Sequence, residues 1–239
     1  MAFATTRWTL VVRAGTADPD GRAALAELCQ SYWAPVYAFY RRLGRSRADA
    51  EDLTQGLFAR LLAGNDFASV ARERGRFRSW LLACARHHLA DVQAADQAQK
   101  RGGGQVVSLD VLAEEQRLAL ASSQESPEQA YARSWVRSVV ERVFSRLAAE
   151  YEPRGRARVL AAARPWLLLE NGDEPMRAAA AALGTSEGAF KVAVHRLRQR
   201  FHELLQAEIG QTLAGPDEVA AEMAHLLELL AGRDSRGSV

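Results

Sequence analysis

Apolar residues recur every three or four positions along most of this chain, which is the spacing that aligns side chains on one face of a helix. No stretch alternates apolar and polar residues between turn signals, as a half-buried strand would. The pattern therefore predicts an all-α fold. Its clearest stripes lie within residues 22–43, 49–64, 77–92, 126–151, 156–170, 186–205 and 219–230.

Break signals divide these stripes into two groups. Three consecutive glycines at 102–104 end the first group, and a polar run follows them. Ser126, Pro127 and Glu128 then supply a capping hydroxyl, a proline for the first helical position and an acid, which together begin a new helix. We expect a first helical domain at 1–103, a flexible linker at 104–125, a second helical domain at 126–211, and a C-terminal helix with its tail at 212–239.

Residues 177–205 have the pattern of a helix-turn-helix. A short Ala-rich helix leads to Gly184, Thr185 and Ser186, which suit a left-handed helix end followed by an N-cap. The next helix has an apolar stripe formed by Phe190, Val194, Leu197, Phe201 and Leu204. Its other face carries Gly188, Lys191, Val192, His195, Arg196 and Gln199. In this motif the second helix enters the major groove of DNA; an ordinary helical hairpin with a solvated basic face is the other interpretation.

Basic and aromatic residues alternate around the start of the helix that begins near residue 77. Cations meet phosphates and flat rings stack on unpaired bases, so this mixture suits single-stranded nucleic acid. The alternative is that the rings belong to the core, which we favour for Phe77 and leave open for Trp80. The basic residues of this stretch include Arg72, Arg74, Arg76, Arg78 and Arg86.

Charge and composition set few limits on function. The 239 residues carry a formal net charge of +2, which neither requires nor excludes a nucleic-acid partner. The only two cysteines, Cys29 and Cys84, are too far apart for a zinc knuckle or a disulfide framework. No apolar run approaches the ~20 residues of a membrane span. We therefore expect a cytoplasmic protein without membrane insertion.

Catalytic motifs are missing from the sequence. His87 and His88 are adjacent, so on a helix they point about 100° apart and cannot chelate one metal ion. There is no H-x-x-x-H, C-x-x-C, G-x-S-x-G or glycine-rich nucleotide loop. We expect no enzyme activity, no metal and no cofactor.

Three segments, in this order, resemble the sigma-70 family of bacterial RNA polymerase sigma factors, and most closely the small extracytoplasmic-function (ECF) group. DAEDLTQ resembles the polymerase-binding helix of sigma region two. FRSWLLACARHHLAD is similar to the segment that melts and reads the minus-ten promoter element. TSEGAFKVAVHRLRQRF resembles the second helix of region four, which reads the minus-thirty-five element.

The resemblance implies three groups of site residues. Core polymerase would be bound, through the clamp helices of its β′ subunit, by Asp49, Asp52, Gln55 and Gly56. The melted downstream element would be bound by Arg72, Arg74, Arg76, Arg78, Trp80, Arg86 and His87. The upstream duplex would be bound by Ser186, Lys191, Val192, His195, Arg196, Gln199 and Arg200. The chain departs from the family pattern at Gly56, where Glu is usual, at His87, where Asn is common, and at Ala193, where a basic residue is usual.

The implied function is that of a promoter-specificity sigma factor. Its partners would be bacterial core RNA polymerase (β′ clamp helices and β flap) and promoter DNA, both as duplex and as melted single strand. Members of this group are often held inactive by an anti-sigma factor, so an anti-sigma factor or another regulator is a further partner that the resemblance admits. The alternatives are a stand-alone helix-turn-helix regulator that binds operator DNA as a dimer, and a decoy that binds polymerase without starting transcripts.

Overall fold

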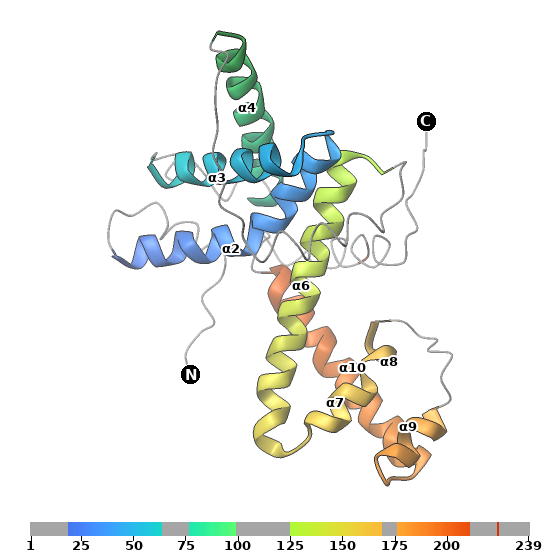
Figure 1. Ribbon diagram of the computed structural model, residues 1–239. Helices are drawn as coiled ribbons and strands as arrows, with labels where there is room; N and C mark the ends of the chain where they lie inside the picture. Colours follow the sequence, from blue (N-terminus) through green and yellow to red (C-terminus); the bar gives the residue numbers. More distant parts are fainter. Residues whose placement is uncertain (1–18, 64–76, 99–124, 169–175, 211–223, 225–239) are drawn as a thin grey trace. The chain divides into compact units, whose positions relative to one another are not determined.

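The computed structural model describes residues 19–63, 77–98, 125–168, 176–210 and 224 (Figure 1). Every regular element in these residues is a helix, and no strand occurs among them, which confirms the predicted all-α fold. The predicted linker, except its last residue, and all but Ala224 of the predicted C-terminal helix lie outside the described residues. Among the described residues, no helix combines the length and the apolar character that crossing a membrane needs.

Contacts between residues divide the chain into two units, and the division falls between Ser138 and Val139. This point lies inside α6 (Pro127–Tyr151), so the helix contributes its first half to one unit and its second half to the other. The predicted second domain starts earlier, at Ser126. The two positions differ because a cap and a proline mark where a helix begins, whereas packing decides which unit each of its turns joins.

The first unit is centred on α2 (Pro19–Arg42), which bends near its middle (Figure 1). Pro35 lies inside this helix and bends it without ending it. The five residues from Val36 to Tyr40 are all at most 1% exposed, so this stretch of the helix is buried on every side. Leu43, at the end of the apolar stripe predicted within residues 22–43, was expected to be buried but is 40% exposed. That expectation was wrong because the helix ends at Arg42 and Leu43 lies in the turn that follows.

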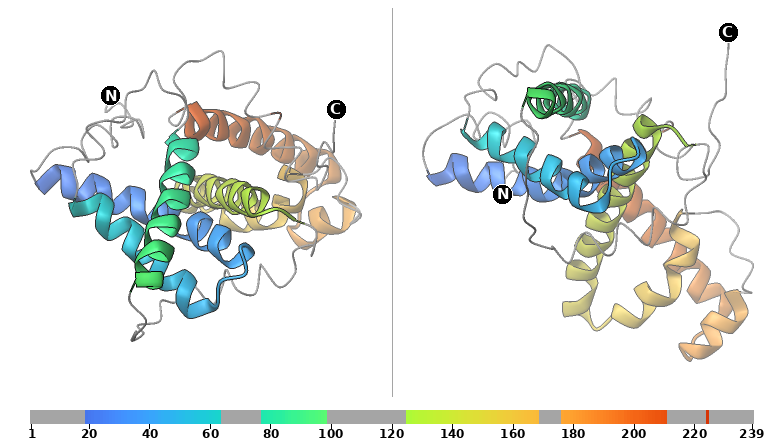
Figure 2. Two further views of the ribbon diagram at one scale, coloured as in Figure 1. Left: turned by 90° about the horizontal axis from the view of Figure 1, so that it is seen from above. Right: turned by 45° about the horizontal axis from the view of Figure 1, so that its top comes forward.

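Helix α3 (Arg47–Ala63) packs along α2, and α4 (Phe77–Ala98) packs on α3 (Figure 2). A side-chain cap begins α3. Ser46 Oγ accepts the Asp49 backbone N–H at 3.1 Å and donates its own proton to Asp49 Oδ2 at 2.7 Å. The stripe predicted for α3 is confirmed, and the stripe predicted at 77–92 is confirmed over its first part: the side chains at most 7% exposed include Ala50, Leu53, Leu57, Leu61, Phe77, Leu81 and Ala85. Further along α4 the predicted stripe residues His88, Leu89 and Val92 are only half-buried.

The second unit consists of the second half of α6, a short 3₁₀ helix (Glu152–Arg154), α7 (Ala157–Ala163), α8 (Pro165–Leu168), α9 (Met176–Ala182) and most of α10 (Glu187–Gly210). All five predicted stripe residues of α10 are buried. The stripe predicted at 126–151 is also buried on α6, through Val136, Val139, Val140, Val143, Phe144 and Leu147. The single helix predicted at 156–170 is two helices. Proline at 165 has no N–H to continue the hydrogen-bond ladder of α7, so it begins a new turn instead.

Candidate polymerase and nucleic-acid surfaces

The outer face of α3 presents acidic and amide side chains to solvent. Asp49, Asp52 and Gln55 follow one another at three-residue spacing and are all exposed. The opposite face is anchored by the buried leucines of the stripe, so the helix cannot rotate without exposing its core. These three predicted polymerase-binding residues therefore form one accessible face.

Gly56, the fourth of that predicted group, is half-buried and faces α4. A Cβ atom at this position would lie 3.0 Å from Nε2 of His88. The absence of a side chain is therefore what lets the His88 ring lie against α3. The stripe predicted at 77–92 did not reveal this contact, although a glycine inside a helix is itself a signal of close approach.

An ion pair lies at the same crossing of α3 and α4. Arg60 Nη1 is 2.5 Å from Asp91 Oδ2, and both side chains are more than half exposed. Burial lowers the pKa of His88, the Arg60 charge lowers it further, and the Asp91 charge opposes them. The His88 ring is therefore neutral at neutral pH, as its packed position requires.

Aromatic rings join the start of α4 to α2. Phe77 is 3% exposed and meets Tyr32 edge-on, with ring centroids 5.1 Å apart. Phe77 is thus a core residue, as expected. Trp80 is half-buried, and its ring lies 5.4 Å from that of Phe77, which leaves part of the indole accessible. Three other residues of the predicted melting group, Arg72, Arg74 and Arg76, lie outside the described residues.

Arg78 and Arg86 of α4 are both engaged by the first half of α6. The Arg78 guanidinium lies over the Trp135 ring, 5.0 Å from its centroid. Arg86 Nη2 lies 2.8 Å from Glu128 Oε1. His87, the residue after Arg86, is exposed. Sequence reasoning missed these contacts because it assigned the whole of α6 to the second domain.

The start of α10 has helix-turn-helix geometry. Gly184 adopts a left-handed conformation (φ +66°), and its N–H donates to the Ala181 carbonyl at 3.0 Å. Ser186 Oγ accepts the Ala189 N–H at 3.2 Å, so the predicted DNA-binding serine serves here as the N-cap of the helix.

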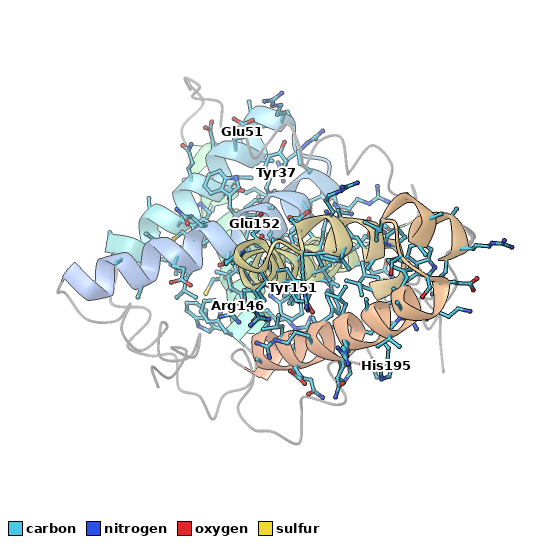
Figure 3. All side chains as sticks on the ribbon, turned by 90° about the horizontal axis from the view of Figure 1, so that it is seen from below. Tyr37, Glu51, Arg146, Tyr151, Glu152 and His195 are labelled. Carbon is cyan, nitrogen blue, oxygen red and sulfur yellow. The ribbon has the colours of Figure 1, made fainter. Side chains whose placement is uncertain are left out.

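The outward face of α10 carries five of the predicted upstream-binding residues. The exposed side chains are Lys191, Val192, His195, Arg196 and Gln199. Val192 is 51% exposed, an unusual position for a large apolar side chain, and His195 points away from the helix (Figure 3). Lys191 lies 2.7 Å from Glu187 one turn earlier, an exposed pair that a phosphate could replace.

Arg200, predicted to bind the same duplex, is used inside the second unit instead. Two of its nitrogens lie 2.6 and 2.9 Å from the two carboxylate oxygens of Glu150 on α6, and a third lies 2.8 Å from Glu203. The hydrogen bonds from Arg200 lower the pKa of Glu150. This fork-to-fork pairing ties α10 to α6 and leaves the charge of Arg200 compensated.

Two further polar contacts of α10 were not expected from the sequence. Arg198 Nε donates to the Trp166 carbonyl at 2.6 Å, which ties α10 to α8. Glu208 is 3% exposed and lies 3.3 Å from Arg142 and 2.9 Å from Arg146. A buried carboxylate needs such positively charged partners. The sequence shows a glutamate inside an apolar stripe, but it does not show which arginines pair with it. The basic residues of α10 thus divide into an outward group and an inward group.

An apolar pocket of ≈ 240 Å³ opens between α7 and the start of α10. Its lining includes Val159, Leu183, Phe190 and Ala193. The resembling family usually has a basic residue at position 193. Here Ala193 contributes a methyl group to this pocket instead.

Comparison with protein-family models matched residues 28–98 to Sigma-70 region 2. The matched segment runs from the middle of α2 through α4, so it contains the exposed face of α3 and the aromatic start of α4. Comparisons with curated proteins and with solved structures returned no match. The region 2 match supports a sigma-70 family protein, with a general role in RNA polymerase binding and promoter melting.

Proposed function

We propose that this protein is a sigma factor of the ECF group, which binds bacterial core RNA polymerase, directs it to specific promoters and promotes DNA melting. The observation that carries the proposal is the region 2 match across α3 and α4. Within that match, α3 offers a solvent-facing row of Asp49, Asp52 and Gln55 on a helix held rigidly by its buried stripe.

The second unit supplies the proposed upstream reader. In the resembling family the equivalent helix contacts the minus-thirty-five element, and here α10 presents Lys191, His195 and Arg196 on one open face. Arg196 makes no ion pair within the described part of the chain, so its charge is available to DNA. Arg200 is left out of this proposed surface because Glu150 and Glu203 hold it.

The downstream element would be bound by the start of α4. Trp80 and His87 remain accessible there, and a partly exposed indole can stack on an unpaired base. Core polymerase would supply the catalysis and much of the DNA affinity, because the net charge of +2 gives the free protein little attraction for phosphate.

Transcription with added core polymerase tests this function. The purified protein and core enzyme should yield transcripts from fragments of the protein's own genome. The double substitution Asp52→Ala with Gln55→Ala should abolish both core binding and transcripts. A matched control is available on α2, where Glu27 and Gln30 are likewise an exposed acid and an exposed amide three residues apart.

The control pair Glu27→Ala with Gln30→Ala should leave transcription intact. Tight duplex binding without any core binding would instead indicate a stand-alone regulator. Core binding without transcripts from any fragment would indicate a decoy.

A further inference from the structure

The first half of α6 is buried in the first unit. Ala130, Tyr131, Ser134 and Trp135 are each at most 4% exposed. The helix begins with a reciprocal cap, in which Ser126 N–H donates to Gln129 Oε1 and Ser126 Oγ accepts the Gln129 N–H. These turns therefore form a defined surface element and not a frayed end.

This half-helix lies on the face of α4 that carries the proposed strand-binding arginines. The Tyr131 hydroxyl donates to the Arg78 carbonyl at 3.0 Å, and the Trp135 ring receives the Arg78 guanidinium. One turn before Tyr131, the Glu128 carboxylate accepts from Arg86 at 2.8 Å. Every described arginine of the proposed melting group is thus in contact with α6.

The chemistry of these contacts is the chemistry that DNA would offer. The Glu128 carboxylate binds Arg86 as a DNA phosphate would, and the Trp135 ring stacks on Arg78 as an unpaired base would. The outer pair is exchangeable, because the Arg86 and Glu128 side chains are 53% and 46% exposed and such pairs contribute little stability.

The inference that follows rests on the proposed function. We propose that the first half of α6 is an autoinhibitory cover. In the free protein it occupies the strand-binding face of α4, and its release exposes Arg78 and Arg86 to single-stranded DNA. The alternative is a permanent fourth helix of the first unit. In that case Arg78 and Arg86 are structural residues and never contact DNA.

A charge cycle on the full-length protein separates the two. Binding of a fluorescent single-stranded DNA oligonucleotide would be measured for the wild type, Glu128→Gln, Arg86→Gln and the double variant. Glu128→Gln should tighten binding by about two- to fivefold, because it frees the Arg86 charge. The double variant should show no such gain. Glu27→Gln, which makes the same charge change on exposed α2, measures the effect of net charge alone.

Equal gains from Glu128→Gln and Glu27→Gln, or a gain that persists without Arg86, would overturn the cover. Hydrogen exchange of residues 127–138 provides a second test that needs no substitution. Exchange there should rise when the wild type binds core polymerase and a promoter with a premelted downstream element. Unchanged protection in a complex that does start transcripts would refute the cover and leave the sigma function standing, whereas failure to bind core would refute the function itself.

Discussion

At the scale of single residues, the α3–α4 crossing depends on the missing side chain of Gly56. Glycine in a helix interior normally costs about 1 kcal/mol relative to alanine. Here that cost accompanies a close approach, because a Cβ atom would lie 3.0 Å from the His88 ring. The residue at position 56 and the ring at position 88 should therefore be energetically coupled.

Gly56→Ala should consequently stabilise the protein less than helix propensity alone predicts. In a His88→Ala background the same change should recover a gain of up to ~1 kcal/mol, which urea unfolding would measure. Gly188→Ala is the control, since nothing lies within 4 Å of a Cβ atom there. Identical effects of Gly56→Ala with and without His88 would contradict the coupling.

The arginines of α10 should behave differently from one another. Arg200→Ala breaks the paired contacts with Glu150 and Glu203, so it should lower the free energy of unfolding by up to about 1 kcal/mol. Arg196→Ala removes an exposed charge, so it should leave stability within ~0.5 kcal/mol and weaken binding of duplex DNA. Urea unfolding and duplex titration of both variants provide the comparison. A larger loss of stability from Arg196→Ala than from Arg200→Ala would contradict this expectation.

Acid should remove the contribution of Glu150. Its pKa is lower in the folded protein than in the unfolded chain, chiefly because of the hydrogen bonds from Arg200. The pair therefore stabilises the fold fully above the ordinary glutamate pKa of about 4.3, and this stabilisation is lost as pH falls through the lower folded pKa. Wild type and Glu150→Gln should differ in stability at pH 7 and converge in urea titrations once the pH has fallen below the folded pKa of Glu150. A difference that grows as pH falls would rule this out.

At the scale of elements, the sequence predicted helices best where one face is apolar and the other polar. The stripes of α3, α6 and α10 were correct because each of these helices has one buried side. The five consecutive buried residues at 36–40 could not be found that way, since burial on all sides leaves no period to detect. The interruption at Pro165 was readable in principle, because proline inside a helical pattern ends the preceding turn.

The sequence predicted where candidate site residues lie on their helices, but not which residues they form ion pairs with. Periodicity placed Asp52, Gln55 and Arg196 on outer faces, where the structure has them. The family resemblance placed Arg200 on the DNA-binding surface, and neither periodicity nor the resemblance gave a partner to Arg86. Both arginines pair with glutamates more than forty residues away in sequence, and a pattern read within one helix carries no information about such contacts.

At the scale of the whole molecule, the two units have different kinds of support. The first contains the region 2 match, and its proposed surfaces lie on α3 and α4. The proposed role of the second unit rests on the local geometry of its helix-turn-helix, from the left-handed Gly184 to the Ser186 cap. Helix α6 contributes to both units, so a substitution in either half of it is a test of the unit to which that half belongs.

This sharing determines where the protein can be cut. A recombinant fragment that stops in the predicted linker, such as 1–125, would lack Tyr131 and Trp135 and would leave their buried neighbours on α2 and α4 open to water. A fragment 1–138 retains them, so it should resist protease longer and unfold at a higher urea concentration than 1–125. The useful end of the first unit for expression is therefore a point in the middle of a helix, where a boundary chosen from loops would never place it.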